Sequence, residues 1–103
     1  MYTAGAVPLD AEGRLVGPED VAAQTRQVID NLLNALDVAG ARGDDVVKTT
    51  VYVVGERKLL GAAWEVVRES ALAGAPSTLL GVSSLGYDGQ LVEIEAVAVI
   101  EAK

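Results

Sequence analysis

The 103-residue sequence contains no cysteine and no histidine. Without cysteine it forms no disulfide and has no thiolate nucleophile, and without histidine it lacks the base of the usual Ser-His-Asp and Cys-His schemes. The common ligands of transition metals are missing as well, and no acidic loop spacing indicates an oxygen-ligand site, so we expect no metal. Glycine-rich phosphate loops are also absent, which argues against kinase and hydride-transfer chemistry.

Positive charge is scarce, since 8 Lys and Arg side chains stand against 15 Asp and Glu side chains and give a net charge of −7. Affinity for nucleic acid rests largely on clustered Lys and Arg, so we expect no nucleic-acid partner. The sequence also lacks a basic start followed by an apolar run, and any stretch of about 18 apolar residues. We therefore expect a soluble, cytoplasmic protein with no membrane partner.

Aliphatic residues are what the sequence has in abundance. Half of the residues are hydrophobic, yet there is no phenylalanine and only 1 tryptophan, so a core of Val, Leu, Ile and Ala is expected. A chain of this length is most simply one domain with a single core, residues 1–103.

Two segments have helical periodicity. Residues 17–20 (GPED) supply a proline and acidic side chains suited to a helix start, and apolar residues then recur at helical spacing up to an end near Gly40. The polar residues of this helix, including Gln24 and Asn31, are expected on its outer face. The apolar spacing of residues 57–72 predicts a second helix.

Three further segments are typical of strands. Residues 46–54 (VVKTTVYVV) are rich in β-branched residues and largely apolar at both parities, which predicts a central strand. Residues 77–84 and 91–101 are the other two, and the last one alternates in polarity. Because Asp88-Gly89 is a hairpin signal, these two strands are expected to pair with each other, antiparallel. The positions of the last strand expected to face the core are Val92, Ile94, Ala96, Ala98 and Ile100.

Together with a β-like segment at residues 1–9, the order of elements is β, α, β, α, β, β. This order predicts a two-layer α+β domain, in which two helices pack on one face of a single mixed sheet. Val97 and Val99 would then leave apolar surface on the other face, and a symmetric oligomer is the ordinary way to cover it. The abrupt start of the first strand suggests that a preceding strand is missing.

Two glutamates are the first candidates for chemistry. Glu93 and Glu95 share one face of the last strand, about 7 Å apart along it. Such a pair could hold a water molecule, or one carboxylate could raise the pKa of the other. The alternative is that both acids are solvated, or pair with an arginine of a neighbour.

Three other side chains have two interpretations each. Lys48 could form a Schiff base, or it could be a charge at the edge or rim of the sheet. Tyr52 and Tyr87 could present phenol groups to a ligand, or they could pack in the core or at its rim. Trp64 is expected to pack on the second helix against the sheet.

Four blocks of the sequence resemble the RidA/YjgF family, also called the L-PSP or reactive-intermediate-deaminase family, and together they span nearly the whole chain in order. The blocks are AGAVPLDAEGRLVG at residues 4–17, QTRQVIDNL at 24–32, DDVVKTTVYV at 44–53, and APSTLLGVSSLGYDGQLVEIEAVAV at 75–99.

This resemblance implies a chorismate-mutase-like α+β fold that forms a homotrimer, with small-molecule ligand clefts between subunits. Active members of the family hydrolyse enamines or imines such as 2-aminoacrylate to the 2-keto acid and ammonia, without a cofactor. In those members an arginine grips the substrate carboxylate and a glutamate near the end of the chain positions the attacking water. The resemblance makes Glu93 that catalytic glutamate, and it assigns Gly5, Ser77, Thr78 and Tyr87 to substrate binding.

The chain departs from the family pattern at several positions. Ser77 stands where the family has its arginine, and only Gly5 remains of a Ser-Gly-Gln motif. The asparagine of the family's helix aligns near Trp64, and the family's first strand has no counterpart.

Because a neutral hydroxyl replaces a guanidinium, we expect 2-aminoacrylate to be a poor substrate. The first hypothesis is a divergent trimer that binds a neutral or differently charged metabolite, with a deaminase-like hydrolysis through Glu93. The second is a non-catalytic trimer for ligand sensing or protein interaction. An endoribonuclease that inhibits translation fits less well with an acidic chain that lacks histidine.

Overall fold

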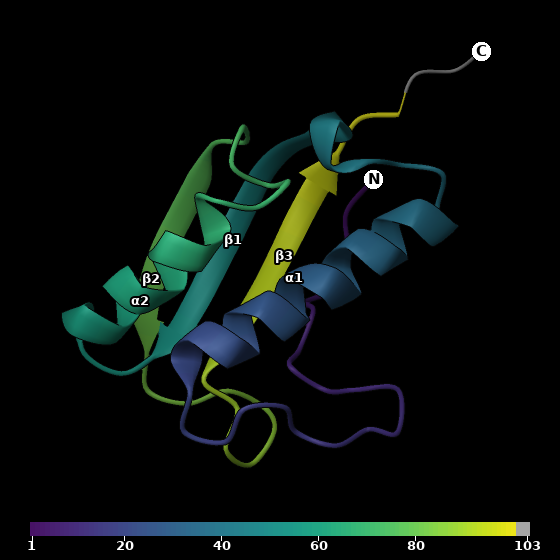
Figure 1. Cartoon of the computed structure of the whole chain (residues 1–103). Helices are drawn as coiled ribbons and strands as arrows, with labels where there is room; N and C mark the ends of the chain where they lie inside the picture. The colour runs from purple at the N-terminus through teal and green to yellow at the C-terminus, as the bar shows by residue number, and fades with distance from the viewer. Residues whose placement is uncertain (101–103) are drawn as a thin grey trace.

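The computed structural model describes residues 1–100 (Figure 1). It contains two helices, α1 (Val21–Val38) and α2 (Arg57–Val67), and three strands, β1 (Val46–Val54), β2 (Ser77–Val82) and β3 (Val92–Ala98). A short 3-10 turn, Gly43–Asp45, precedes β1. This order confirms the predicted α+β class. No helix within residues 1–100 has the length and hydrophobicity needed to cross a membrane.

A capping side chain marks the start of helix α1, and a glycine follows its end. Asp20 caps it, because its Oδ1 accepts a hydrogen bond from the backbone N–H of Ala23 at 3.0 Å. Beyond Val38 the chain reaches Gly40, whose φ of 86° is typical of glycine after a helix. Helix α2 is shorter than predicted, since it ends at Val67 and residues 68–72 form turns. Trp64 packs against the core from α2, as expected.

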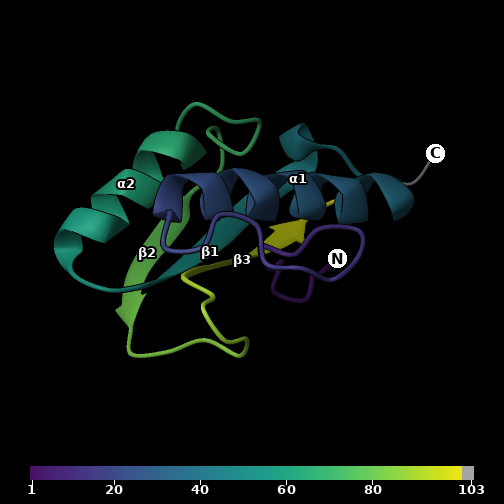
Figure 2. The same cartoon turned by 60° about the horizontal axis from the view of Figure 1, so that its bottom comes forward.

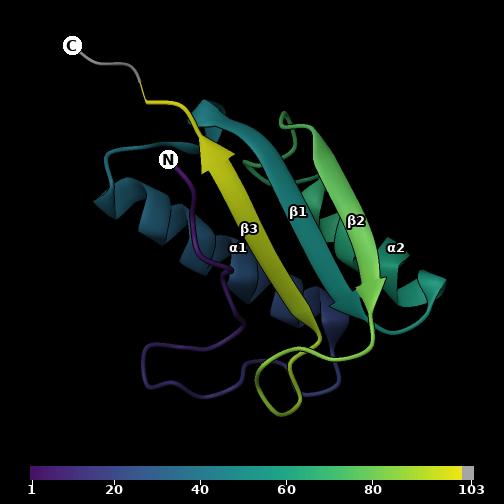
Figure 3. The ribbon, with the colours of Figure 1, turned by 180° about the vertical axis from the view of Figure 1, so that it is seen from behind.

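The strand order is β2-β1-β3, and Figure 3 shows β1 between the other two strands. The predicted pairing of residues 77–84 with residues 91–101 is therefore wrong. Strand β1 pairs with β2 in parallel and with β3 antiparallel. Helix α2 is the crossover that parallel neighbours require, and the long 83–91 loop then carries the chain past β1 to its other edge.

The N-terminal residues lie along the free edge of β3, beside it in Figure 3. They form isolated bridges, Tyr2 with Val97 and Ala6 with Ile94, rather than the continuous strand predicted for residues 1–9. Four residue steps on this segment stand opposite three steps on β3, so one extra residue is accommodated between Tyr2 and Ala6. An extra residue of this kind bends a strand locally, and here the irregularity includes Gly5.

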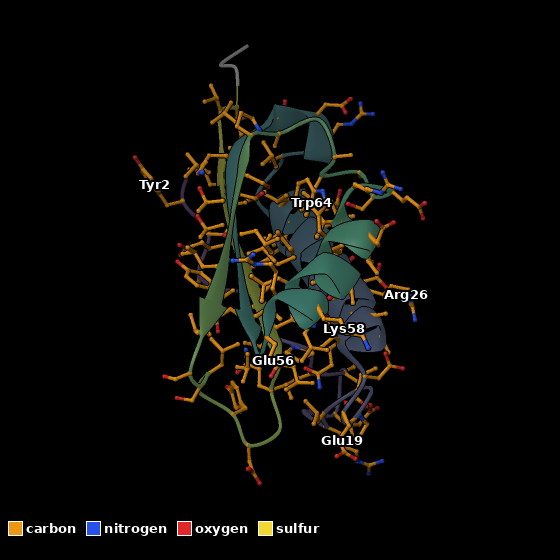
Figure 4. The ribbon with its side chains drawn as sticks, turned by 90° about the vertical axis from the view of Figure 1, so that its left-hand side faces the viewer. Tyr2, Glu19, Arg26, Glu56, Lys58 and Trp64 are labelled. Atoms are coloured by element: carbon orange, nitrogen blue, oxygen red, sulfur yellow. The ribbon has the colours of Figure 1, made fainter. Side chains whose placement is uncertain are left out.

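Helices α1 and α2 both lie on one side of the sheet, which Figures 2 and 4 show from two directions. The even-numbered residues of β3 from Val92 to Ala98 face this layer and are buried, as predicted, whereas Ile100 is exposed. No helix within residues 1–100 covers the other side of the sheet, which we call the open face. By strand alternation, the side chains on the open face are Lys48, Thr50, Tyr52, Val54, Thr78, Leu80, Val82, Glu93, Glu95 and Val97.

Candidate functional site

Glu93 lies near the start of β3, on the open face, and is half-buried. Its Oε1 accepts a hydrogen bond of 3.2 Å from the side-chain amide of Gln90. Its Oε2 lies against Gly5, because a Cβ atom built on Gly5 would be only 2.2 Å from this oxygen. Only glycine leaves room for the carboxylate in this position, so the structure brings together two of the residues that the sequence singled out.

Gln90 is the polar side chain that contacts Glu93, and sequence reasoning missed it. Its side chain is 3% exposed, at the end of the 83–91 loop. Besides bonding to Glu93, Nε2 donates to the carbonyl of Val92 at 3.1 Å, and Oε1 accepts from the backbone N–H of Tyr87 at 3.1 Å. The available signal was its place three residues before Glu93, between a glycine and the start of an apolar strand.

Gln24 and Asn31 also differ from the prediction, which placed both on the outer face of the first helix. The side chain of Gln24 is completely buried. Its amide donates to the carbonyls of Gly17 and Gly89, both at 3.1 Å, and accepts from the N–H of Leu91 at 2.7 Å. Asn31 donates to the carbonyls of Val7 and Leu9, both at 2.8 Å. These amides anchor two segments to helix α1, the N-terminal segment and the 83–91 loop, and both segments contact Glu93 or its partner Gln90.

Tyr52 and Glu95 form a second polar pair on the open face. The phenol of Tyr52 donates a hydrogen bond of 2.5 Å to Oε1 of Glu95. This bond raises the pKa of Tyr52 above its ordinary value of 10.0, and partial burial and the negative charges of Glu95 and Glu93 raise it further. Tyr52 is the cross-strand neighbour of Glu93, so it lies opposite one carboxylate while its phenol bonds to the other.

The predicted binding residues of β2 do not join the cluster around Glu93. Ser77 lies on the helix side of the sheet, where its hydroxyl is hydrogen-bonded to that of Thr49. Thr78 lies on the open face, where its hydroxyl accepts a hydrogen bond from the ammonium group of Lys48. Because β1 separates β2 from β3, the backbones of Ser77 and Glu93 are at least about 10 Å apart within one chain.

The 83–91 loop surrounds a hollow of about 530 Å³, lined by its own residues and by Val54. Tyr87 lies in this loop with 54% of its side chain exposed. Its backbone is tied to Gln90, which places it in the same cluster as Glu93. Gly5, Tyr87, Gln90 and Glu93 thus form the candidate site within one chain.

This site can offer a hydrogen-bond acceptor to a ligand. Oε1 of Glu93 is engaged by Gln90, whereas Oε2 accepts no hydrogen bond from residues 1–100. No Lys or Arg of residues 1–100 forms an ion pair with Glu93, since the pair found there joins Arg68 and Glu65. That same part of the chain contains no group of three or more acidic side chains arranged to hold a metal ion. A carboxylate with one engaged and one available oxygen is suited to accept a proton from water.

Comparisons with known proteins agree with the fold. A family model described as Endoribonuclease L-PSP matches residues 1–100. The chain is 36% identical over 102 residues to the 2-iminobutanoate/2-iminopropanoate deaminase of Escherichia coli (strain K12), with 96% of this chain and 78% of that protein covered. It is 35% identical over 99 residues to a RutC family protein of Pyrococcus abyssi, with 95% and 76% covered.

Solved structures show the same arrangement of elements. A Rid family protein of unknown function from Yersinia pestis superimposes with a TM-score of 0.84 at 36% identity, over 97% of this chain and 77% of that one. A member of the YjgF/YER057c/UK114 family from Mycobacterium tuberculosis gives a TM-score of 0.79 at 32% identity, over 96% and 77%. These matches define the class as the small α+β domain of Rid proteins. The chain belongs to the Endoribonuclease L-PSP family, the RidA/YjgF family that its sequence resembles.

Proposed function

We propose that this chain is a cofactor-independent hydrolase of an imine or enamine, with Glu93 as its catalytic carboxylate. The observation that carries the proposal is the position of Glu93, whose Oε1 is held by Gln90 and whose Oε2 lies against Gly5 and accepts no hydrogen bond from residues 1–100. The name of the Escherichia coli relative, 2-iminobutanoate/2-iminopropanoate deaminase, supports this class of reaction.

In the proposed reaction, the oxygen of a water molecule attacks the imine carbon while Glu93 accepts a proton from that water. Glu93 passes this proton to the imine nitrogen, which gives a carbinolamine, in which carbon carries both a hydroxyl and an amino group. Glu93 then takes the hydroxyl proton and delivers it to the amino group, so the carbonyl forms as the carbon–nitrogen bond breaks and ammonia leaves. The sum is imine plus water to carbonyl compound plus ammonia, with no change of oxidation state. General acid–base catalysis of this kind contributes about 100- to 10,000-fold.

The substrate is proposed to be neutral or cationic rather than an anionic imino acid. Ser77 offers a neutral hydroxyl, already bonded to Thr49, where the resembled family has an arginine. A charge-assisted bond to a carboxylate contributes about 1.5–3 kcal/mol, which is roughly 10- to 100-fold in affinity. Within residues 1–100, Glu93 has no Lys or Arg ion-pair partner that could take the place of this arginine.

We further propose a homotrimer with ligand clefts between its subunits. This would explain why Thr78, which lies on the open face, is on a different strand from Glu93, since a neighbouring subunit could bring its β2 to the Glu93 cluster. The open face, which carries exposed Leu80, supports an assembly that covers it.

The test uses two imines made in the assay. One is 2-iminopropanoate, formed from D-alanine by D-amino acid oxidase, and the other is the uncharged imine formed from benzylamine by a flavin amine oxidase. Ammonia release is measured in competition with semicarbazide. We expect faster hydrolysis of the benzylamine-derived imine, and a loss of about 100-fold or more in Glu93→Gln. The control Glu95→Gln removes the neighbouring carboxylate and should retain the rate within about threefold.

Two results would contradict this proposal. Full activity in Glu93→Gln would remove the proposed role of that carboxylate, and a preference for 2-iminopropanoate would contradict the substrate class. The second candidate function, a non-catalytic ligand sensor, is favoured by the engagement of Ser77 with Thr49. It predicts no ammonia release from either imine, together with a ligand-induced rise in melting temperature.

A further inference from the structure

We infer that Gln90 is a positioning residue, whose side-chain amide fixes the Glu93 carboxylate and the backbone at Tyr87 in one arrangement. The inference deepens the proposed function and rests on it, because it concerns the same carboxylate. It adds a residue that neither the sequence patterns nor the family resemblance indicated.

The hydrogen bonds of Gln90 allow only one orientation of its amide. Both N–H groups of Nε2 are used, one by the carbonyl of Val92 at 3.1 Å and one by Oε1 of Glu93 at 3.2 Å. The carbonyl oxygen accepts from the N–H of Tyr87 at 3.1 Å. A flipped amide would set a donor against the Tyr87 N–H and an acceptor against two acceptors. At 3% exposure, water cannot readily compensate for those three losses.

This fixed amide limits the positions that Glu93 can adopt. A glutamate side chain has three rotatable bonds and would otherwise sample several rotamers on the open face. The hydrogen bond from Gln90 holds Oε1, and Oε2 lies against Gly5, so the positions of both carboxylate oxygens are restricted. Displacing a reacting group by about 1 Å can reduce a rate by about 100-fold. Loss of the amide should therefore lower kcat more than it raises KM.

Gln24 provides a matched control. It is also buried, and it also holds the 83–91 loop, through the carbonyl of Gly89 and the N–H of Leu91. It forms no hydrogen bond with Glu93. Replacing either glutamine by methionine keeps the side-chain length and removes a buried amide, but only the change at residue 90 removes the bond to the carboxylate.

The first experiment compares Gln90→Met with Gln24→Met by hydrolysis of the benzylamine-derived imine, alongside melting temperatures. Both variants should lose stability, since each leaves buried backbone groups without partners. We expect Gln90→Met to lose about tenfold or more in kcat with KM within about threefold, and Gln24→Met to keep kcat within about threefold. Equal losses of kcat in the two variants, or a normal kcat in Gln90→Met, would overturn the inference.

Gln90→Glu separates the two tasks of the amide. It keeps an oxygen that can accept from the Tyr87 N–H, but when ionised it sets a second carboxylate against Glu93. Protonation of the new carboxyl restores a donor. The ratio of variant to wild-type kcat should therefore rise as pH falls. A ratio that does not change with pH would show that the amide only supports the loop, which contradicts positioning of the carboxylate.

A measurement that needs no activity distinguishes failure of this inference from failure of the proposed function. In ¹⁵N-labelled protein, Glu93→Ala should shift the side-chain amide signals of Gln90 and speed their exchange with water, while the signals of Gln24 stay in place. If the wild-type protein hydrolyses neither imine, the proposed function fails, and this spectrum still tests whether the amide holds the carboxylate. Unchanged Gln90 signals would overturn the inference.

Discussion

A side chain at residue 5 and the carboxylate of Glu93 cannot occupy the same space. The Cβ of an alanine at this position would lie 2.2 Å from Oε2 and 2.5 Å from Cδ of Glu93. The backbone of Gly5 lies outside the region that favours glycine, so this contact, rather than backbone strain, explains the glycine. The structure thus gives a physical reason for the one residue that remains of the family's Ser-Gly-Gln motif.

Gly5→Ala should therefore displace the Glu93 carboxylate and lower imine hydrolysis by about tenfold or more, since small displacements of a reacting group are costly. Gly74→Ala is the control, because its Cβ would meet no atom within 4 Å and its φ is ordinary. The measurements are the rate of hydrolysis of the benzylamine-derived imine and the melting temperature of each variant. A Gly5→Ala variant as active as Gly74→Ala would show that Glu93 does not need its present position.

Which buried residues could be predicted depended on their polarity. Glu93 and Gly5 were singled out by strand alternation and by the family resemblance, and both lie in the cluster. Gln24 lies three residues after Val21 and four before Val28, so its spacing was that of a buried position. Because glutamine is polar, the prediction placed Gln24 on the outer face of the helix instead. The partner that makes its burial favourable, Gly89, is 65 residues away and could not be foreseen from the helix itself.

Elements that follow one another in the chain are not always neighbours in the sheet. The Asp88-Gly89 signal is local and correctly indicates a turn, yet it carries no information about which strands the turn connects. The apolar residues at both parities of Val46–Val54 were the better indicator, because a strand covered on both edges and on one face is central. In the observed sheet β1 is central, and the connection between β2 and β3 is a loop around the end of the sheet.

The pairing of β1 with β3 predicts a pH effect through Tyr52. Because its pKa is raised in the folded chain, the folded state holds the phenolic proton more tightly than the unfolded state. The resulting stabilisation is complete below the unfolded value of 10.0 and is lost as pH rises through the folded value. Tyrosinate absorbance of wild type minus Tyr52→Phe should give a midpoint above 10.0, and Glu95→Gln should lower it, since Glu95 is the main cause of the shift.

The same titration has a stability counterpart. Between pH 10.0 and the folded pKa, the free energy of unfolding should decrease more steeply for wild type than for Tyr52→Phe, which has no phenolic proton to lose. Urea unfolding at pH values on either side of 10.0 measures this difference. A Tyr52 signal that titrates below 10.0, or identical slopes in the two proteins, would contradict the hydrogen bond to Glu95.

At the scale of the whole molecule, the two faces of the sheet differ in what covers them. Helices α1 and α2 protect one face, and Figure 4 shows Tyr2 on the opposite side of the sheet from the helices. That open face mixes the Lys48–Thr78 and Tyr52–Glu95 pairs with Leu80, whose side chain is 42% exposed. Hydrogen-bonded polar pairs around an apolar side chain are compatible with an interface between protein subunits.

The proposed trimer can be tested on this face with one substitution. Leu80 lies beside Tyr52 on the open face, in the edge strand β2, so Leu80→Lys would place a charge in the proposed interface without touching the core under the helices. Light scattering should give three times the 10.6 kDa chain mass for wild type and a smaller mass for Leu80→Lys. Val38→Lys is the control, because Val38 ends α1 with 89% exposure and its variant should keep the wild-type mass.

A monomeric wild type, or a Leu80→Lys protein that keeps the full mass, would mean that the sheet is not buried between subunits at Leu80. Ligand clefts that need β2 of a neighbour would then lose their basis.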